Sequence, residues 1–127
     1  METKSPWVAV VDDNPAIRRA MVRLLRSAGI DAQAFSCGKS FLRSISANPP
    51  FSVILDVHMP DQSGIEVQAI LQSLAPQIGV ILISGFPKPQ EQFRASHEMP
   101  LAYLQKPVSD QLLLNAIAQT YRLGATT

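Results

Sequence analysis

Residues 8–15, VAVVDDNP, set the architecture of this chain, because four apolar residues run directly into two adjacent carboxylates. A short, continuous apolar run is typical of a strand that is buried on both faces. Asp12 and Asp13 follow that strand, although each carboxylate raises the cost of ionising the other. Asn14 and Pro15 then supply a capping residue and a proline for the first turn of a helix. The acidic turn is therefore either part of a solvated helix cap or a site that holds a cation.

The helix predicted after this turn is amphipathic. Apolar residues recur at steps of three and four and define the buried face, while arginines occupy the remaining face. The apolar residues are Ile17, Ala20, Met21, Leu24, Leu25 and Ala28, and the arginines are Arg18, Arg19, Arg23 and Arg26. Gly29 is placed to end the helix. The arginine face is either simply solvated or takes part in the choice of a partner.

Four further apolar runs alternate with helix-like segments and predict an α/β fold. The five expected strands lie at residues 7–11, 32–35, 51–55, 80–83 and 102–104. Weaker helical periodicity appears at residues 41–45, 67–74 and 112–120. The alternation favours a doubly wound domain, in which right-handed crossovers give an open parallel sheet with helices on both faces. Pro87, Pro89 and Pro100 interrupt the segment before the last strand, so the fourth helix expected there is the least regular element.

The composition bounds the function. With 127 residues, 46% of them hydrophobic, residues 1–127 are expected to form one domain. A formal net charge of +1 gives no large field for gripping nucleic acid or an anionic membrane. The single cysteine, Cys37, excludes an internal disulfide, and no apolar run approaches the roughly 18 residues of a membrane span. We expect a soluble cytoplasmic protein whose role depends on a local site.

Polar residues stand at the carboxyl ends of four of the five expected strands. Asp12 and Asp13 follow the first strand, Asp56 the third, Ser84 the fourth and Lys106 the fifth. In a parallel sheet all carboxyl ends lie along one edge, and open α/β sheets bind ligands in the crevice at that edge. Residues that are far apart in the sequence are therefore expected in a single pocket.

This predicted pocket has the chemistry of phosphoryl transfer. Three carboxylates about 5 Å apart repel by a few kcal/mol per pair at an effective dielectric of about 20, so a cation must compensate them. Hard carboxylate oxygens without clustered histidine or cysteine favour Mg²⁺, which also binds phosphate oxygens. Lys106 adds a second positive charge and Ser84 adds a hydroxyl donor. A nucleophilic carboxylate, a metal, a cation and a donor favour transfer of a phosphoryl group.

Four motifs make the chain resemble the receiver domain of two-component response regulators over essentially its whole length. They are VVDDNP at residues 10–15, LDVHMPDQSG at 55–64, ISG at 83–85 and YLQKP at 103–107. Residues 24–35 and 112–117 are similar to the FixJ type, in which a receiver precedes a helix-turn-helix output domain. We expect no such output domain within these residues. The resemblance implies a flavodoxin-like (βα)5 fold with the family's strand order, 2-1-3-4-5.

The resemblance also implies a set of metal ligands and a phosphoacceptor. Asp56 would attack the phosphorus of a phosphohistidine in a sensor histidine kinase. Asp13 and Asp56 would ligate Mg²⁺ directly, Asp12 would do so through water, and His58 would use its backbone carbonyl. The His58 side chain is expected to face solvent in a loop, since one histidine without a partner makes a poor metal site.

Two further residues are implied to act on the phosphoryl group, and one to report its presence. Lys106 would pair with the phosphoryl oxygens, Ser84 would hydrogen-bond one of them, and the Lys106–Pro107 peptide bond would be cis. Tyr103 matches the aromatic residue that turns inward when the Ser84 hydroxyl moves towards the phosphate. Packing of Tyr103 on its strand is the alternative role.

Phosphorylation would change the partner preference of one surface. In the family this surface consists of the fourth helix, the fifth strand and the fifth helix, and it would control an output domain, a partner or a homodimer. The similarity to the FixJ type implies regulation of transcription. Leu114, Ala118 and Tyr121 lie off the core-facing stripe of the last helix and form either such an interface or an extension of the core.

Two other functions fit parts of the pattern. An aspartyl-nucleophile phosphohydrolase would need an acid two residues after the nucleophile to activate water, but His58 occupies that position. A pseudo-receiver is a phosphorylation-independent interaction module that typically lacks one of the acidic or basic site residues. All of them are present here, which favours the phosphoacceptor.

Overall fold

The computed structural model describes residues 6–60, 62–85 and 102–125. Its five strands form one parallel sheet in the order β2-β1-β3-β4-β5, which confirms the predicted α/β fold and strand order. The strands are β1 (Trp7–Val11), β2 (Asp31–Phe35), β3 (Ser52–Asp56), β4 (Gly79–Ser84) and β5 (Ala102–Gln105). Each strand begins and ends within one residue of its predicted position.

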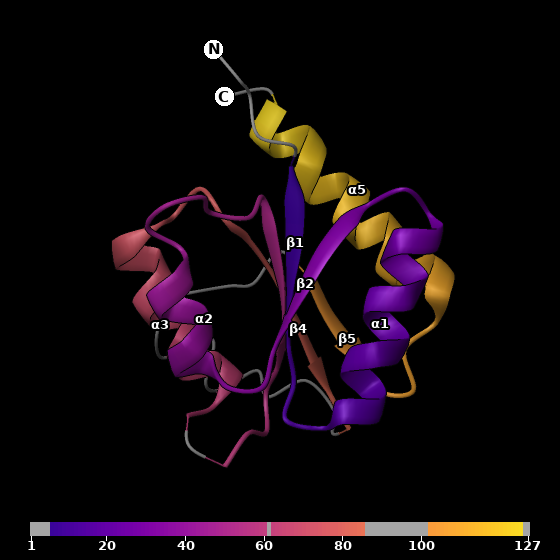
Figure 1. Ribbon diagram of the computed structural model, residues 1–127, viewed down its shortest axis with the longest axis horizontal. Coiled ribbons are helices and arrows are strands. Elements are labelled where there is room, and N and C mark those ends of the chain that lie inside the picture. Colours follow the sequence, from indigo (N-terminus) through magenta and orange to yellow (C-terminus); the bar gives the residue numbers. More distant parts are fainter. Residues whose placement is uncertain (1–5, 61, 86–101, 126–127) are drawn as a thin grey trace.

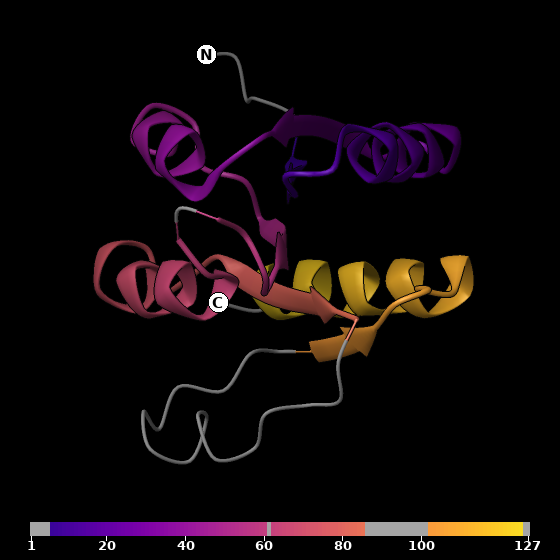
Figure 2. The same cartoon turned by 90° about the horizontal axis from the view of Figure 1, so that it is seen from below.

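Helices cover both faces of the sheet (Figures 1 and 2). Helices α1 (Pro15–Ser27) and α5 (Asp110–Ala125) lie on one face, and α2 (Gly38–Ser44) and α3 (Gly64–Leu74) lie on the other. None of these helices is both long enough and apolar enough to cross a bilayer. The fourth helix that we predicted before β5 would fall in residues 86–101, which lie outside the described residues.

The alternation of side chains along the strands divides the core into two layers. Val8, Val10 and Ile54 point towards α1 and α5, while Ala9 and Leu55 point towards α2 and α3. Every residue of β1 and β3 is buried, as expected for strands covered on both faces. Full burial of one such aliphatic side chain contributes about 1.5–3 kcal/mol, so the central strands anchor the domain.

Strand β2 departs from the double-sided burial that we predicted for all strands. Of its five residues only Ala32 is buried, Phe35 is half-buried and the remaining three are exposed. The reason is its position, because β2 is an edge strand with a single neighbouring strand, β1. Gln33, in the middle of the predicted strand at residues 32–35, is a polar residue that fits this edge position.

Helix α1 begins and ends at the predicted signals. The Asn14 side-chain oxygen accepts hydrogen bonds from the backbone N–H of Ala16 at 2.9 Å and of Ile17 at 3.2 Å. Pro15 occupies the first turn, where its missing N–H removes no helical hydrogen bond. Gly29 has a φ of 81°, a left-handed conformation that favours glycine after a helix. These local signals fix the point at which α1 meets the acidic turn.

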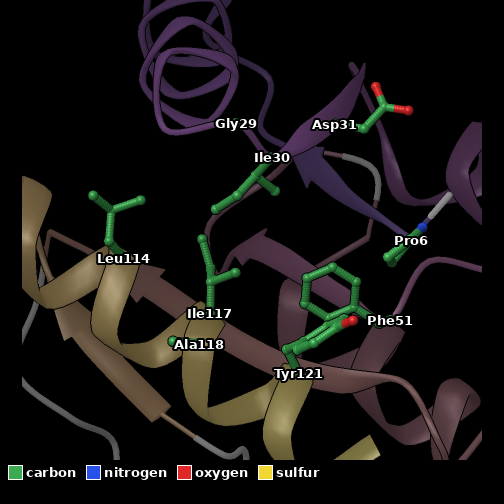
Figure 3. Close-up of a pocket in the computed structure, with 9 residues that line it drawn as sticks. All are labelled: Pro6, Gly29, Ile30, Asp31, Phe51, Leu114, Ile117, Ala118 and Tyr121. Carbon is green, nitrogen blue, oxygen red and sulfur yellow. The ribbon is translucent and has the colours of Figure 1, made fainter. Parts of the chain in front are cut away.

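A cavity of about 570 Å³ lies at the amino edge of the sheet, next to the second half of α5. Leu114, Ala118 and Tyr121 line it from α5, and Phe51 lines it from the loop before β3 (Figure 3). The rings of Phe51 and Tyr121 meet edge to face, with centroids 5.2 Å apart. Leu114 packs against the core, whereas Tyr121 is 48% exposed. The apolar face predicted on the last helix therefore extends the core on one side and borders solvent on the other.

Candidate functional site

The register of the sheet brings the carboxyl ends of its strands to one level. Val11 pairs with Leu55, and Asp56 pairs with Ile83. Because all the strands are parallel, the residues that follow them emerge along one edge. The topology thus brings together the polar residues that the sequence places at the strand ends.

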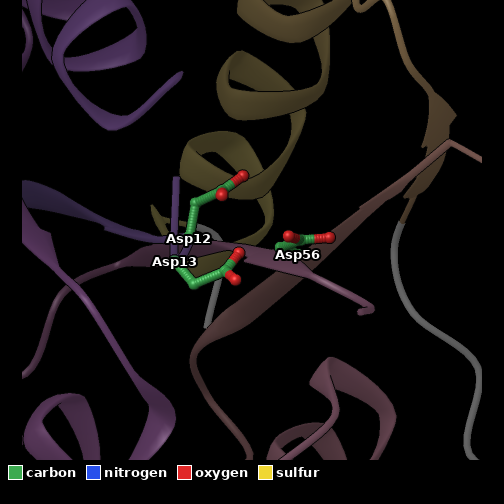
Figure 4. Close-up of side chains that lie close together, drawn as sticks. All are labelled: Asp12, Asp13 and Asp56. Atoms are coloured by element: carbon green, nitrogen blue, oxygen red, sulfur yellow. The ribbon is translucent and has the colours of Figure 1, made fainter. Parts of the chain in front are cut away.

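The three predicted carboxylates meet at this edge (Figure 4). One oxygen from each of Asp12, Asp13 and Asp56 lies within 4.8 Å of the other two. Asp12 and Asp56 are buried, at 0% and 4% exposure, whereas Asp13 is exposed. The backbone N–H of Asn14 donates to Asp12 Oδ1 at 2.9 Å, and that of His58 donates to Asp56 Oδ1 at 3.1 Å. Two carboxylates are thus held in place by the backbone, and the third is open to solvent.

The Lys106 ammonium lies between the two buried carboxylates. Its Nζ is 3.4 Å from Asp12 Oδ2 and 3.5 Å from Asp56 Oδ2. The Lys106 backbone N–H donates to the Ser84 carbonyl at 2.7 Å, which joins the loop after β5 to the end of β4. The Lys106–Pro107 peptide bond is cis, as the resemblance implied. When all four side chains are ionised, one ammonium faces three carboxylates, so negative charge is left uncompensated.

The surroundings of Asp56 disfavour its charged form. Burial raises the pKa of Asp56 above its ordinary value, and repulsion from Asp12 raises it further. The hydrogen bond from the His58 backbone and the charge of Lys106 act in the opposite direction without cancelling that rise. A divalent cation would relieve this repulsion. The hard oxygen donors and their close spacing fit Mg²⁺.

Gly64 is a site residue that we did not single out from the sequence. Its N–H donates to the Val57 carbonyl at 3.0 Å, and a Cβ at this position would lie 2.6 Å from the Asp56 carbonyl oxygen. Only glycine permits this close approach between the first turn of α3 and the end of β3. The available signal was a glycine directly after the Ser63 cap of α3, eight residues beyond Asp56.

The arginine face of α1 is more ordered than a solvated face would be. Arg18 Nη1 donates to the Asp12 carbonyl at 2.7 Å, and Arg26 Nη2 donates to the Ala32 carbonyl at 3.0 Å. Neither of our two readings of this face, solvation or partner choice, included such anchoring. Two of the four arginines therefore attach α1 to the backbone around β1 and β2.

The remaining predicted site residues, Ser84, Tyr103 and His58, differ in their exposure to solvent. Ser84 is the last residue of β4 and is fully buried. Tyr103 is half-buried, pairs with Leu82 in the sheet and packs against the layer beneath α2 and α3. His58 is exposed, as expected for its side chain, and it reaches Asp56 through its backbone N–H.

Comparison with known proteins gives one consistent result. Residues 8–118 match the response regulator receiver domain. The chain is 32% identical over 124 residues to the response regulator protein TodT of Pseudomonas putida. The aligned residues cover 98% of this chain and 55% of TodT. The chain is 34% identical over 110 residues to nodulation protein W of Bradyrhizobium diazoefficiens, covering 87% of this chain and 48% of that protein. The chain thus spans about half the length of these relatives.

Solved structures give the same result. The response regulator StyR is 33% identical, with a TM-score of 0.81 over 97% of this chain and 62% of the StyR chain. A response regulator receiver domain protein from Clostridium thermocellum is 27% identical, with a TM-score of 0.85 over 97% of this chain and all of that chain. The fold, the sequence match and the family match agree, and they show that this chain belongs to the response regulator receiver domain family.

Proposed function

We propose that this chain accepts a phosphoryl group onto Asp56 from a sensor histidine kinase, with Mg²⁺ as cofactor. One observation carries the proposal, which is the position of Lys106 Nζ 3.4 Å from Asp12 and 3.5 Å from Asp56 at the carboxyl edge of the sheet. A nucleophilic carboxylate, a cation and an acidic cluster in one crevice are the groups that phosphoryl transfer needs. Membership of the receiver family supports the same reaction.

In the proposed reaction a carboxylate oxygen of Asp56 attacks the phosphorus of a phosphohistidine. The new O–P bond forms as the N–P bond breaks, and the imidazole of the kinase leaves with the electron pair and takes up a proton from solvent. Lys106 is placed to pair with the phosphoryl oxygens, and Ser84 to hydrogen-bond one of them. Asp56 must be ionised to attack, and the charge of Lys106 favours that form against burial.

Asp12, Asp13 and Asp56 are the residues that would hold Mg²⁺, together with the His58 backbone carbonyl. When bound, the ion stabilises the negative charge that develops on the phosphoryl oxygens. Asp13 is the exposed member of the cluster, so it keeps the site open to solvent and to a phosphodonor. The buried pair, Asp12 and Asp56, supplies the fixed side of the site.

In this proposal Ser84 and Tyr103 form the switch. Tyr103 pairs with Leu82, two residues before Ser84, so side-chain alternation puts both on the α2 and α3 side of the sheet. Phosphorylation adds about −1.5 to −2 charge, which would draw the Ser84 hydroxyl towards the site. Tyr103 would then turn inward and alter the surface of β5 and α5. That surface would signal to an output domain, a partner or a second copy of the chain, with an effect on transcription.

A groove next to Lys106 is the surface that a kinase would cover. It has a volume of about 470 Å³ and lies between α1 and the start of α5. Ile17, Leu24, Pro107 and Val108 line it. An apolar groove beside a nucleophile provides area for docking and excludes water from the transfer. This partnership would place the protein in the cytoplasm.

The test is labelling by a small acyl phosphate in the presence of Mg²⁺, followed by intact mass spectrometry. The wild-type protein should gain one phosphoryl group, and Asp56→Asn should gain none. Asp31→Asn, which changes an exposed carboxylate at the other edge of the sheet, should be labelled like the wild type. Labelling of Asp56→Asn at the wild-type level would overturn the assignment.

The same experiment separates the other two functions. A phosphorylation-independent interaction module would not be labelled at all, although its fold would be the same. A phosphohydrolase would release phosphate from phosphate esters over many turnovers, whereas a phosphoacceptor would not turn over such esters.

A further inference from the structure

We infer that Arg18 is a positioning residue that holds the Asp13 carboxylate in place for a divalent cation; this inference rests on the proposed function. Asp13 differs from Asp12 and Asp56 in the contacts that its carboxylate makes. Asp12 and Asp56 each accept a backbone N–H and face Lys106. Within the described part of the chain, the Asp13 carboxylate has no hydrogen bond or ion pair. Its position therefore depends chiefly on the backbone that carries it.

Arg18 holds the backbone on both sides of Asp13. Its guanidinium donates from Nη1 to the Asp12 carbonyl at 2.7 Å, and its own backbone N–H donates to the Asn14 carbonyl at 3.0 Å. The peptide group between Asp12 and Asp13 is planar, so fixing its oxygen also fixes the orientation of the Asp13 nitrogen. The second contact is the ordinary helical hydrogen bond of α1, so the Nη1 contact with the Asp12 carbonyl is the one that the arginine side chain supplies.

The chemistry of the contact suits this role. A hydrogen bond from a charged guanidinium to a carbonyl is stronger than one between neutral groups. The positive charge of Arg18 also lies close to the acidic turn, where it stabilises the carboxylates but repels a second cation, so its charge and its hydrogen bond act on Mg²⁺ binding in opposite directions. Groups that orient metal ligands typically change metal affinity by about 10- to 100-fold when they are removed. An exposed ligand such as Asp13 has most to lose, since no packing replaces the lost anchor.

The neighbouring arginine is a matched control. Arg19 is also on α1 and carries the same charge, but it is exposed, and its side chain makes no hydrogen bond or ion pair with another described residue. Arg19→Ala therefore removes a positive charge near the site without removing the anchor. Arg18→Ala removes both the charge and the hydrogen bond to the Asp12 carbonyl. Arg18→Lys keeps a positive charge and a donor group but loses the planar guanidinium.

The test is calorimetric titration with Mg²⁺ alone, without a phosphodonor. Arg18→Ala should weaken Mg²⁺ binding by about tenfold, Arg18→Lys should recover part of the loss, and Arg19→Ala should stay within about twofold of the wild type. Thermal unfolding without Mg²⁺ verifies that the variants are folded. Wild-type affinity in Arg18→Ala, or an equal loss in Arg19→Ala, would overturn the inference.

A second readout does not depend on metal binding. In NMR spectra recorded without Mg²⁺, the amide signals of Asp13 and Asn14 should shift or broaden in Arg18→Ala and stay in place in Arg19→Ala. If the wild-type protein bound no Mg²⁺, the proposed function would fail. The amide signal of Asp13 would still show whether Arg18 orders the turn. An unchanged signal in Arg18→Ala would refute that positioning role.

Discussion

At the carboxyl edge of the sheet the buried side chains include Asp12, Asp56 and Ser84, whereas at the amino edge they include Trp7 and Ile117. The carboxyl edge gathers like charges within 4.8 Å. At the amino edge, the Trp7 indole N–H donates to the Asn48 carbonyl, and Phe51 stacks edge to face on Tyr121. The same five strands thus end in an electrostatically unfavourable site on one side and in apolar packing on the other.

This difference shows how the domain divides its tasks. Charge burial at the carboxyl edge costs stability, because desolvated carboxylates that repel each other disfavour the folded state. Apolar burial in the strands and at the amino edge supplies stability that is independent of ionisation. Changes at the two edges should therefore have opposite effects on folding, and only those at the carboxyl edge should alter binding of a cation.

The largest effect is expected at the amino edge. Ile117 is 1% exposed, and Ile117→Ala should lower the free energy of unfolding by about 3 kcal/mol, because it enlarges a cavity that already borders the side chain. Urea denaturation measures the loss. Leu112→Ala on the same helix removes a side chain that is 56% exposed and should change stability by less than about 0.5 kcal/mol. Equal losses in the two variants would contradict the assigned packing.

A smaller effect, confined to the carboxyl edge, is expected from Mg²⁺. At ten times its dissociation constant, the ion should stabilise the wild-type protein by about 1.4 kcal/mol, because it binds the folded state alone. Asp13→Asn should lose this stabilisation, whereas Asp31→Asn at the amino edge should keep it. Thermal unfolding with and without Mg²⁺ measures both. The same gain in Asp13→Asn would show that the ion acts elsewhere on the chain.

Sequence patterns were sufficient for most of the fold because the central strands are apolar on both faces and the helix caps are explicit. VAVV in β1 and the Asn14-Pro15 pair act locally, so their signal is visible without tertiary structure. The gathering of polar residues at one edge was predictable because parallel strands deliver their carboxyl ends there, and the contact of Asp12 and Asp13 with Asp56 also needs β1 beside β3. Edge position was missed because we grouped β2 with the central strands, although its sequence, DAQAF, is less apolar than WVAVV in β1 or SVILD in β3.

The residues that we missed act through the backbone. Gly64 matters because a Cβ would meet the Asp56 carbonyl, and Arg18 matters because its guanidinium reaches the Asp12 carbonyl. A glycine or an arginine in the sequence does not indicate which backbone group it will contact, whereas clustered carboxylates indicate a cation. Such contacts depend on the angle at which a helix meets a strand, which periodicity does not encode.

The smallest effect is a gain in stability at the carboxyl edge. In the absence of Mg²⁺, Asp56→Asn should raise the free energy of unfolding at pH 7 by roughly 1 kcal/mol. The gain comes from removing a buried charge and its repulsion from Asp12, and it is partly offset by the lost attraction to Lys106. The asparagine oxygen can still accept the hydrogen bond from the His58 backbone. Urea denaturation of the two proteins across a range of pH measures the difference.

The pH dependence follows from the raised pKa of Asp56 in the folded state. The folded protein binds the proton of the Asp56 carboxyl group more tightly than the unfolded chain does. Ionisation of Asp56 at higher pH therefore costs the folded state more free energy than the unfolded state. The advantage of Asp56→Asn should therefore be full above the raised pKa and should vanish as the pH falls towards about 4, the ordinary range of an aspartate. Asp31→Asn, an exposed carboxylate at the amino edge, should show no comparable gain. An advantage that grows on acidification would mean that Asp56 stabilises the folded state through its charge, and the contrast between the two edges would then be wrong.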